Sequence, residues 1–380
     1  MESKYNQLKL IDLSILLKRG KSAKYGKSKI QIIKSGQARG WFDFDFSERH
    51  YVDDSFVLDE RKLVKGDLLI NSTGVGTAGR VTYFGEDGDF VADSHITIFR
   101  PNQNLILSQY ALCVLGRIGF VNIENMALGQ SGQIELSLDV IGNIKIPVPP
   151  IDIQKQIVEE IGKVDKSVSV AKSSIDNKIS DIKTIISRLV STVSIKEYFD
   201  INTQTLNPVS CWKNEHFTYV DIDSVGKGDG SISFDKTLLG KDAPSRARRV
   251  AQDRTVIVST VRPYLKGFAY IENVLNKTIF STGFALLKSK NEENYISKLL
   301  YYLFMFSDDL MKQMEAAMPK AAYPSINKED IDNFKIPLLT IDEQKRIVVQ
   351  IEAIELEITK ARTLIENATS EKQAILDKYL

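Results

Sequence analysis

The sequence predicts an α+β protein made of two similar globular α/β segments that are separated by two long helices. Three observations predict this class. A motif of 17 residues occurs twice, at an offset of 190 residues in a chain of 380. Each copy leads into a stretch whose apolar residues repeat with helical spacing. The remaining segments are rich in glycine and aromatic residues and contain short apolar runs that are typical of strands.

The composition favours a folded protein of more than one domain. With 43% hydrophobic and 26% charged residues, a chain of 380 residues can bury a core but is too long for a single ordinary one. The longest apolar runs fall far short of the ~20 residues that span a bilayer, and the N-terminus has no signal-peptide pattern. We therefore expect a cytoplasmic protein that has no membrane partner.

Metal, disulfide and catalytic patterns are missing from the sequence. Cys113 and Cys211 lie 98 residues apart, and the chain has three histidines in total. No CxxC or HxxxH spacing occurs, so we expect neither a zinc site nor a disulfide framework. No Ser-His-Asp or Cys-His arrangement can be assembled, and the Asn-Pro-Pro-aromatic tetrapeptide of amino-methyltransferases is absent. We therefore expect no catalytic residue and no cofactor held by this chain.

The repeated motif indicates an internal duplication. Lys145–Ile161 aligns without gaps to Lys335–Ile351, and ten of the 17 pairs are identical. A weaker match joins Ser72-Thr73 to Ser259-Thr260 at an offset of 187. The chain is therefore expected to consist of two copies of one unit of roughly 190 residues.

The stretches 151–195 and 338–380 are predicted to be long helices with coiled-coil seams. At ~1.5 Å per residue, each would form a rod of ~60 Å that acts as a spacer. Two such seams on one chain can pair if the chain returns antiparallel, or each can pair with another subunit. Polar residues interrupt the predicted seam at Asp165, Lys172 and Lys372. The apolar seam residues are Val158, Ile161, Val168, Ile175, Ile182, Leu189, Ile347, Ile351, Ile354, Ile358 and Ile365.

The globular segments 1–150 and 196–337 are predicted to contain short strands, turns and a few helices. Strands are expected at residues 66–72 and 80–84 in the first copy and at 255–260 and 267–271 in the second. Helices are expected at 105–114 and at 295–314.

Two glycine-rich loops resemble nucleotide-binding motifs without meeting their requirements. Gly74–Gly79 has the GxGxxG pattern, but the residues after it are β-branched and aromatic where a dinucleotide site needs a helix. These glycines are better explained as the tip of a hairpin. Gly20–Ser28 resembles a P-loop, but it has one residue too many between its glycines to form the amide cradle.

Basic side chains gather in loops of both segments, although the net charge of +1 gives no support for nucleic-acid binding by itself. They are interleaved with glycine, serine and tyrosine, which suits contact with phosphates. Arg and Gln can also read guanine and adenine edges. We expect a double-stranded DNA interface that comprises Lys21, Lys24, Lys27, Arg39, Ser72, Thr73, Arg80, Gln130 and Gln133 in the first segment and Arg246, Arg248, Arg249, Thr260, Arg262, Lys266, Lys320 and Tyr323 in the second.

The whole chain resembles the specificity subunit of type I restriction-modification enzymes. The resemblance lies in Ile146–Val158, in its second copy Ile336–Val348 and in the helix after each copy. The segment Gly66–Ile70 and the glycine loop behind it resemble the target recognition domains of that family. The second copy departs from the pattern, because Leu338-Leu339-Thr340 replaces Val148-Pro149-Pro150 and Ser259–Pro263 replaces a glycine-rich tip.

The resemblance implies an organisation and a set of partners. Residues 1–150 and 196–337 would be target recognition domains, and the helices 151–195 and 338–380 would be antiparallel spacers that measure the gap between two DNA half-sites. Two methyltransferase subunits, which bind S-adenosylmethionine, would dock on the helices, and ATP- and magnesium-dependent restriction subunits can join. The chain itself would be the non-catalytic subunit of the complex.

Two expectations about the DNA target follow. Domain centres ~35 to 50 Å apart would correspond to ~10 to 15 base pairs at ~3.4 Å each. The target should be asymmetric, because the two recognition segments share a plan and differ in residues. Two alternatives remain open at the level of sequence: a non-DNA coiled-coil scaffold that carries a duplicated ligand-binding domain, and a free-standing enzyme that uses the Gly74–Gly79 loop.

Overall fold

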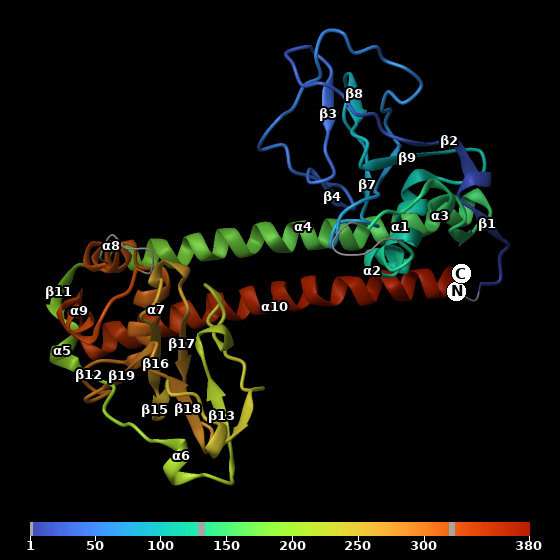
Figure 1. Cartoon of the computed structure of the whole chain (residues 1–380). Coiled ribbons are helices and arrows are strands. Elements are labelled where there is room, and N and C mark those ends of the chain that lie inside the picture. The colour runs from blue at the N-terminus through green and yellow to red at the C-terminus, as the bar shows by residue number, and fades with distance from the viewer. Residues whose placement is uncertain (1–2, 128–133, 319–323) are drawn as a thin grey trace. The chain divides into compact units, whose positions relative to one another are not determined.

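The computed structural model of the chain describes residues 3–127, 134–318 and 324–380. Its contacts define two units (Figure 1). The first unit comprises Met1–Val170 with Leu364–Leu380, and the second unit comprises Ala171–Thr363. Two long helices, α4 (Ile151–Ser187) and α10 (Ile341–Tyr379), contribute residues to both units. Each unit therefore contains one globular part and one end of each long helix.

The first unit is built on a four-stranded antiparallel sheet. Its order is β2 (Ser14–Arg19), β9 (Ile96–Pro101), β6 (Leu68–Asn71) and β7 (Val81–Tyr83). The other strand pairs are β3 (Gln31–Ile33) with β8 (Phe90–Ala92), β4 (Ala38–Gly40) with β5 (Asp43–Phe44), and β1 (Gln7–Lys9) with β10 (Lys145–Pro147). The short helices are η1 (Ile11–Leu13), α1 (Ser108–Ile118), α2 (Phe120–Glu124) and α3 (Leu138–Gly142).

The second unit repeats this plan. Its corresponding sheet has the order β12 (Phe199–Ile201), β19 (Phe284–Ser289), β16 (Thr255–Ser259) and β17 (Phe268–Ile271). A second sheet has the order β14 (Thr237–Leu239), β13 (His216–Val220), β18 (Thr278–Ser281) and β15 (Ala247–Arg249), and β11 (Ser191–Ser194) pairs with β20 (Lys335–Pro337). The helices are α5 (Ile195–Tyr198), α6 (Pro208–Cys211), η2 (Ile222–Ser224), η3 (Gly240–Asp242), η4 (Pro263–Leu265), α7 (Ser297–Phe306), α8 (Asp308–Ala317) and α9 (Lys328–Asn333).

The predicted duplication is confirmed by the strand order. Both units have a middle strand, β6 or β16, that is entirely buried and pairs on both sides. A parallel pair also recurs, as β3 with β8 and as β13 with β18. The expected strands at 66–72 and 80–84 correspond to β6 and β7. The single helix expected at 295–314 is wrong: α7 ends at Phe306, and α8 restarts after Ser307, whose side chain caps it by accepting from the Leu310 amide.

Each copy of the repeated motif contains one buried glutamine with a structural role. Gln154 accepts a hydrogen bond from the Leu107 amide and donates to the carbonyls of Leu105 and Pro149. Gln344, at the same place in the second copy, makes the same three types of contact in its own unit. Both side chains are completely buried. Each glutamine therefore joins the start of a long helix to the globular part of its unit.

The central helix is shorter than expected, because α4 ends at Ser187 and residues 191–194 form strand β11. The run Val190–Ser194 is rich in β-branched and hydroxyl side chains, which favour a strand, and β11 finds a partner in β20. The predicted seam residue Leu189 therefore lies beyond the helix end.

The two long helices run antiparallel within each unit. In the first unit Glu160 pairs with Lys378 and Asp165 pairs with Lys372, and in the second unit Lys178 pairs with Glu357. Residue numbers therefore rise along α4 while they fall along α10. Antiparallel pairing of the long helices was the organisation that the family resemblance implied.

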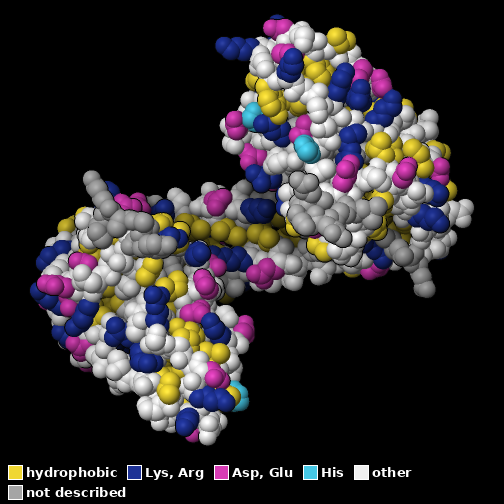
Figure 2. Space-filling model, in the orientation of Figure 1, with side chains coloured by type: hydrophobic (Ala, Val, Ile, Leu, Met, Phe, Trp, Pro, Cys, Tyr) yellow, Lys and Arg dark blue, Asp and Glu magenta, His cyan; other side chains and the backbone are white. Residues whose placement is uncertain are grey.

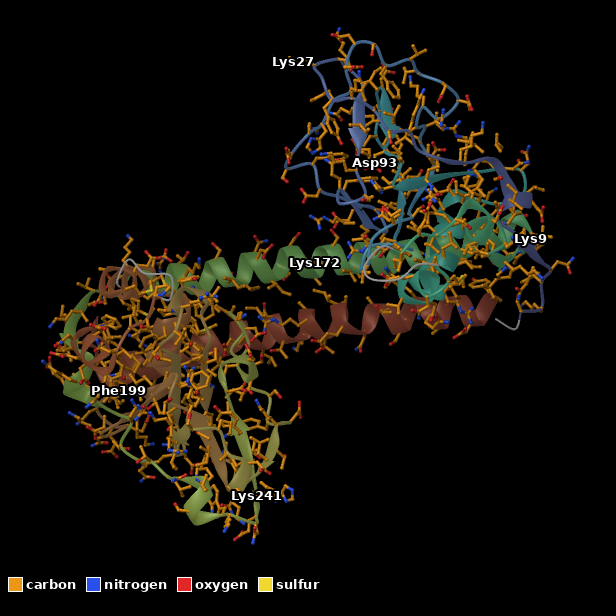
Figure 3. All side chains as sticks on the ribbon, in the orientation of Figure 1. Lys9, Lys27, Asp93, Lys172, Phe199 and Lys241 are labelled. Carbon is orange, nitrogen blue, oxygen red and sulfur yellow. The ribbon has the colours of Figure 1, made fainter. Side chains whose placement is uncertain are left out.

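The seam residues are buried to different degrees. Of the predicted set, Ile161, Ile182, Ile351 and Ile358 are buried, and Val158, Val168, Ile175, Leu189, Ile347, Ile354 and Ile365 are half-buried. Along the first part of α4, Ile157, Val164 and Ala171 are buried. The expected seam positions 158, 165 and 172 are thus each displaced by one residue from the buried positions. This places Lys172 on the exposed side of α4 (Figure 3).

Candidate nucleic-acid interface

The glycine loop of the first unit connects two neighbouring strands as a hairpin, as predicted. Gly74, Gly76 and Gly79 have positive φ angles of 91°, 76° and 88°, which L side chains rarely adopt. Arg80, at the end of the loop, donates to the Gly76 carbonyl at 2.6 Å. Strand β7 follows the loop, whereas a dinucleotide-binding loop is followed by a helix. The glycine loop is therefore not a dinucleotide-binding site of that type.

The second unit builds the corresponding loop without glycine at its strained positions. Arg262 and Lys266 flank helix η4 with φ angles of 47° and 53°. Non-glycine residues are costly in this region, and such strain is concentrated at functional sites. Lys266 is half-buried, and its Nζ donates to the Met305 carbonyl at 2.7 Å. Burial, and then the nearby Lys183, lower the pKa of Lys266. Lys266 therefore supports the loop, and its expected role as a DNA contact stays a prediction.

The lysine-rich loop of the first unit lies between β2 and β3. Lys21, Lys24 and Lys27 are all exposed, and Lys27 points outward at the edge of the unit (Figure 3). Lys21 lies 3.9 Å from Asp59, in an acidic segment that follows in the sequence. Among the described residues no ion pair involves Lys24 or Lys27. These two lysines therefore carry positive charge that no ion pair within the described residues compensates.

Acidic side chains neutralise other parts of the basic surface. Arg39 donates to Asp45 at 2.7 Å, and hydrogen bonds from Ser47 and Arg39 hold the pKa of Asp45 well below its usual range. Figure 2 shows Lys and Arg interspersed with Asp and Glu on the visible face of the first unit. The visible face of the first unit therefore carries charges of both signs, consistent with the net charge of +1.

The arginine cluster of the second unit is partly internal. Arg246 is exposed, whereas Arg248 and Arg249 are half-buried. Arg248 donates to the Ala247 carbonyl at 2.7 Å, and burial lowers the pKa of Arg249, whose Nε is buried without a partner. Thr260 is half-buried and donates to the Gly283 carbonyl at 2.9 Å.

One expected contact is wrong, and four lie outside the described residues. Ser72 is completely buried, because its hydroxyl bonds to Thr97 and to the Ile70 carbonyl inside the sheet. It therefore has no surface for DNA. Its neighbour Thr73 is half-buried and bonds to His95 Nδ1 at 2.7 Å. The residues that fall outside the described part of the chain are Gln130, Gln133, Lys320 and Tyr323.

Sequence reasoning missed several residues that join the globular parts to the helices. Trp41 donates its indole N–H to Asp165 at 3.2 Å, and Tyr302 donates its hydroxyl to Glu355 at 2.6 Å. A signal existed for Asp165, which interrupts the predicted apolar seam. No comparable signal in the sequence marked Trp41 as the partner of Asp165, or Tyr302 and Glu355 as partners of each other.

Cysteine and metal chemistry have no centre in the described part of the chain. Cys113 is buried, Cys211 is exposed, and both are free thiols. Burial raises the pKa of Cys113 to about 12. In the described ranges no cluster of three or more His, Cys, Asp or Glu side chains could hold a metal ion. Across those same ranges, no helix combines the length and apolar character that crossing a membrane requires.

Comparison with known proteins places the chain in a family. The family model described as the type I restriction modification DNA specificity domain matches it twice, at residues 9–180 and 190–367. The two matches cover most of the chain and agree with its duplication. The chain therefore belongs to this family of DNA specificity domains. It is a specificity subunit of the type I restriction-modification class.

Individual relatives support this assignment. A curated protein of Methanocaldococcus jannaschii, named as the MjaX specificity subunit of a type I restriction enzyme, is 22% identical over 98% of this chain and 91% of its own length. The MjaVIII specificity subunit of the same organism is 25% identical over 63% of this chain and 61% of its own length.

Solved structures show the same fold. The S subunit of a type I restriction-modification system from M. genitalium aligns with a TM-score of 0.56 at 14% identity, covering 100% of this chain and 97% of that one. A chain from a study of complex assembly and conformational transition of the type I R-M system aligns with a TM-score of 0.58 at 15% identity, covering 100% and 98%. At these identities the likeness concerns the fold alone.

Proposed function

We propose that this chain is the non-catalytic subunit that gives a type I restriction-modification complex its DNA sequence specificity in the cytoplasm. Each globular part reads one half of a bipartite target, and the long helices set the gap between the halves. One observation carries this proposal: the two units share a strand order but differ in the loop that joins β6 to β7 in the first unit and β16 to β17 in the second. A duplicated scaffold with different loops is suited to reading two different half-sites.

Phosphate contact is assigned to the exposed cations. Lys24 and Lys27 in the first unit and Arg246 and Arg262 in the second are exposed and belong to loops. Such contacts fix the position of a protein on DNA, and base contacts then give sequence specificity. Base reading is assigned to Arg39, Arg80, Gln130, Gln133, Lys320 and Tyr323, whose side chains can bond to base edges.

The long helices are proposed to dock two methyltransferase subunits. Figure 2 shows a strip of hydrophobic side chains along these helices. Val349 and Leu356 lie seven residues apart on α10 and are 63% and 57% exposed. Apolar residues at this spacing lie on one helix face, where a partner helix could cover them. The partner subunits, not this chain, would bind S-adenosylmethionine, and restriction subunits that use ATP and magnesium can join them.

A gel shift with the purified chain and its methyltransferase partner tests the proposal. The complex should shift duplexes that carry both half-sites at one gap, as selected from a random DNA library. Scrambling either half-site should abolish the specific shift. A coiled-coil scaffold that binds a non-DNA ligand would show no sequence-dependent shift, and that outcome would contradict the proposal.

A further inference from the structure

The two long helices carry a carboxylate at the same position, and each carboxylate binds an aromatic side chain of its own unit. Asp165 on α4 and Glu355 on α10 are separated by 190 residues, the offset of the duplication. Trp41 donates to Asp165, and Tyr302 donates to Glu355. Trp41 and Tyr302 come from different parts of their units. The two units therefore share the position of the carboxylate but not the residue that donates to it.

In the first unit a continuous set of contacts leads from the glycine loop to Asp165. Trp41 pairs along strand β7: its amide donates to the Val81 carbonyl and its carbonyl accepts from the Tyr83 amide, both at 2.7 Å. The Trp41 ring also lies against helix α1, since a Cβ added at Gly116 would approach the ring to 2.8 Å. The strand that follows the candidate DNA loop is therefore fixed to the helix α4.

Lys372 completes this cluster from the opposite helix. Its ammonium pairs with Asp165 and lies 4.4 Å from the centre of the Trp41 ring. The side chains of Lys372 and Asp165 are 23% and 31% exposed, so the pair is partly withdrawn from water. Both residues interrupt an otherwise apolar pattern, and they meet each other across the helix pair.

The second unit reaches Glu355 by a different but equivalent path. Lys266, at the end of the loop between β16 and β17, donates to the Met305 carbonyl on α7. The same helix carries Tyr302, which donates to Glu355, and Lys298, which pairs with Glu352 at 2.6 Å. The position that corresponds to Lys372 is Ile182, a buried residue, so no seam lysine from α4 takes part here.

Polar groups in an apolar helix seam fix register at a cost in stability. Seams of isoleucine and valine can pair in more than one register, whereas one polar contact is satisfied in a single register. Replacing such an ion pair with apolar side chains is often neutral or stabilising, so the pair is not needed for stability alone. We propose that Asp165 and Glu355 are positioning residues that seat each recognition loop on the helix pair and thereby restrict the gap between the half-sites. The inference rests on the proposed function.

A set of α4 and α10 variants tests the first unit. Asp165→Leu/Lys372→Leu removes the polar pair and leaves an apolar seam, and Trp41→Phe removes the indole N–H together with part of the ring. The matched control is Glu159→Gln, which breaks an exposed pair with Lys163 on the same helix. Tyr302→Phe tests the second unit. Each chain is assembled with its methyltransferase partner and given duplexes whose gap varies one base pair at a time.

The readout is the ratio of methylation at the preferred gap to methylation at neighbouring gaps. The inference predicts that this ratio falls about tenfold in the double variant, as a loss of ~1.4 kcal/mol of positional preference would give. Half-site preference and the thermal midpoint should stay close to those of the unaltered chain. Trp41→Phe and Tyr302→Phe should lower the ratio in the same direction, and Glu159→Gln should not.

Two outcomes would count against the inference. If all variants keep the gap preference of the unaltered chain, Asp165 and Glu355 only stabilise the fold, and the proposed function stands without them. If the unaltered chain shows no gap preference, the proposed function fails and the inference fails with it. A variant that loses methylation equally at every gap has lost folding or assembly, which overturns the positioning role for that residue.

Discussion

At the scale of single residues, the buried glutamines explain why the motif occurs twice. Gln154 and Gln344 each bond to one amide and two carbonyls, in contacts that are buried or part-buried. A buried, unsatisfied backbone group costs about 1–3 kcal/mol. Replacing either glutamine with an apolar residue of similar size therefore removes the partner of three backbone groups at once.

Gln154→Leu should lower the free energy of unfolding by about 3 kcal/mol, on the basis of the backbone groups left unsatisfied. Urea unfolding followed by circular dichroism measures the change. Gln156→Leu is the matched control, because Gln156 is exposed on the same helix turn and its replacement should change little. Equal, small effects of the two substitutions would show that the Gln154 bonds are not needed.

Glu355 provides a prediction about pH. Burial raises the pKa of Glu355, opposed by the Tyr302 hydrogen bond and by Lys298 and Arg362, while Glu352 adds to the rise. The folded state therefore binds this proton more readily than the unfolded state does, and the carboxylate destabilises the fold above the folded-state pKa. This penalty shrinks as the pH falls towards the unfolded-state pKa.

Glu355→Gln keeps an acceptor for Tyr302 and removes the ionisation. It should therefore raise the thermal midpoint at pH 8, by an amount that declines steadily towards pH 4. Glu357→Gln is a suitable comparison, because a hydrogen bond from Lys178 lowers the pKa of Glu357. That substitution should not stabilise the protein at pH 8. A Glu355→Gln variant that is less stable than the unaltered chain at every pH would contradict this account.

Residue roles were only partly predictable from sequence. The interruptions at Asp165 and Lys372 could be seen in the heptad pattern, but their pairing depends on the register of two helices far apart in the chain. Ser72 was expected at the DNA surface, at the end of a predicted strand, yet that strand is central and completely buried. Alternation alone cannot distinguish a strand end that faces solvent from one that stays inside a sheet.

At the scale of elements, the lysine-rich loop between β2 and β3 should supply non-specific DNA affinity. Lys24→Gln/Lys27→Gln should weaken binding to all sequences alike and reduce the salt slope by about 1.8, since each phosphate contact contributes ~0.9. Titrations at several salt concentrations measure both quantities. Lys155→Gln, an exposed lysine on α4, should leave the slope unchanged. A loss confined to one target sequence would instead assign base reading to these lysines.

Elements with strong periodicity were predicted well, but the end of α4 and the break between α7 and α8 were not. Both long helices occur where proline is missing and the apolar spacing is helical. The end of α4 depends on a strand partner, β20, that lies well over a hundred residues later. The break between α7 and α8 depends on Ser307 as a cap, a signal that the apolar run on either side conceals. The ends of these helices therefore depend on non-local strand pairing and on capping, which the periodicity of the sequence does not reveal.

At the scale of the whole molecule, the two long helices of the duplicated fold are predicted to set the gap between the two DNA half-sites. Insertion of one heptad into α4 after Val170, together with one into α10 after Thr363, would add ~10 Å to each helix. At ~3.4 Å per base pair, the preferred gap should grow by about 3 base pairs while both half-sites keep their sequences. Selection from a random DNA library measures the gap. An unchanged gap would mean that the helices do not set it.

The most direct test of the central claim is methylome sequencing of a host that expresses this chain with its methyltransferase partner. The account predicts methylated adenines in a target of two different half-sites that are separated by a fixed run of unspecified bases. Exchanging residues 196–337 for those of a relative should change one half-site and leave the other half-site unaltered. A single continuous palindrome, or methylation that ignores the distance between the half-sites, would contradict the account.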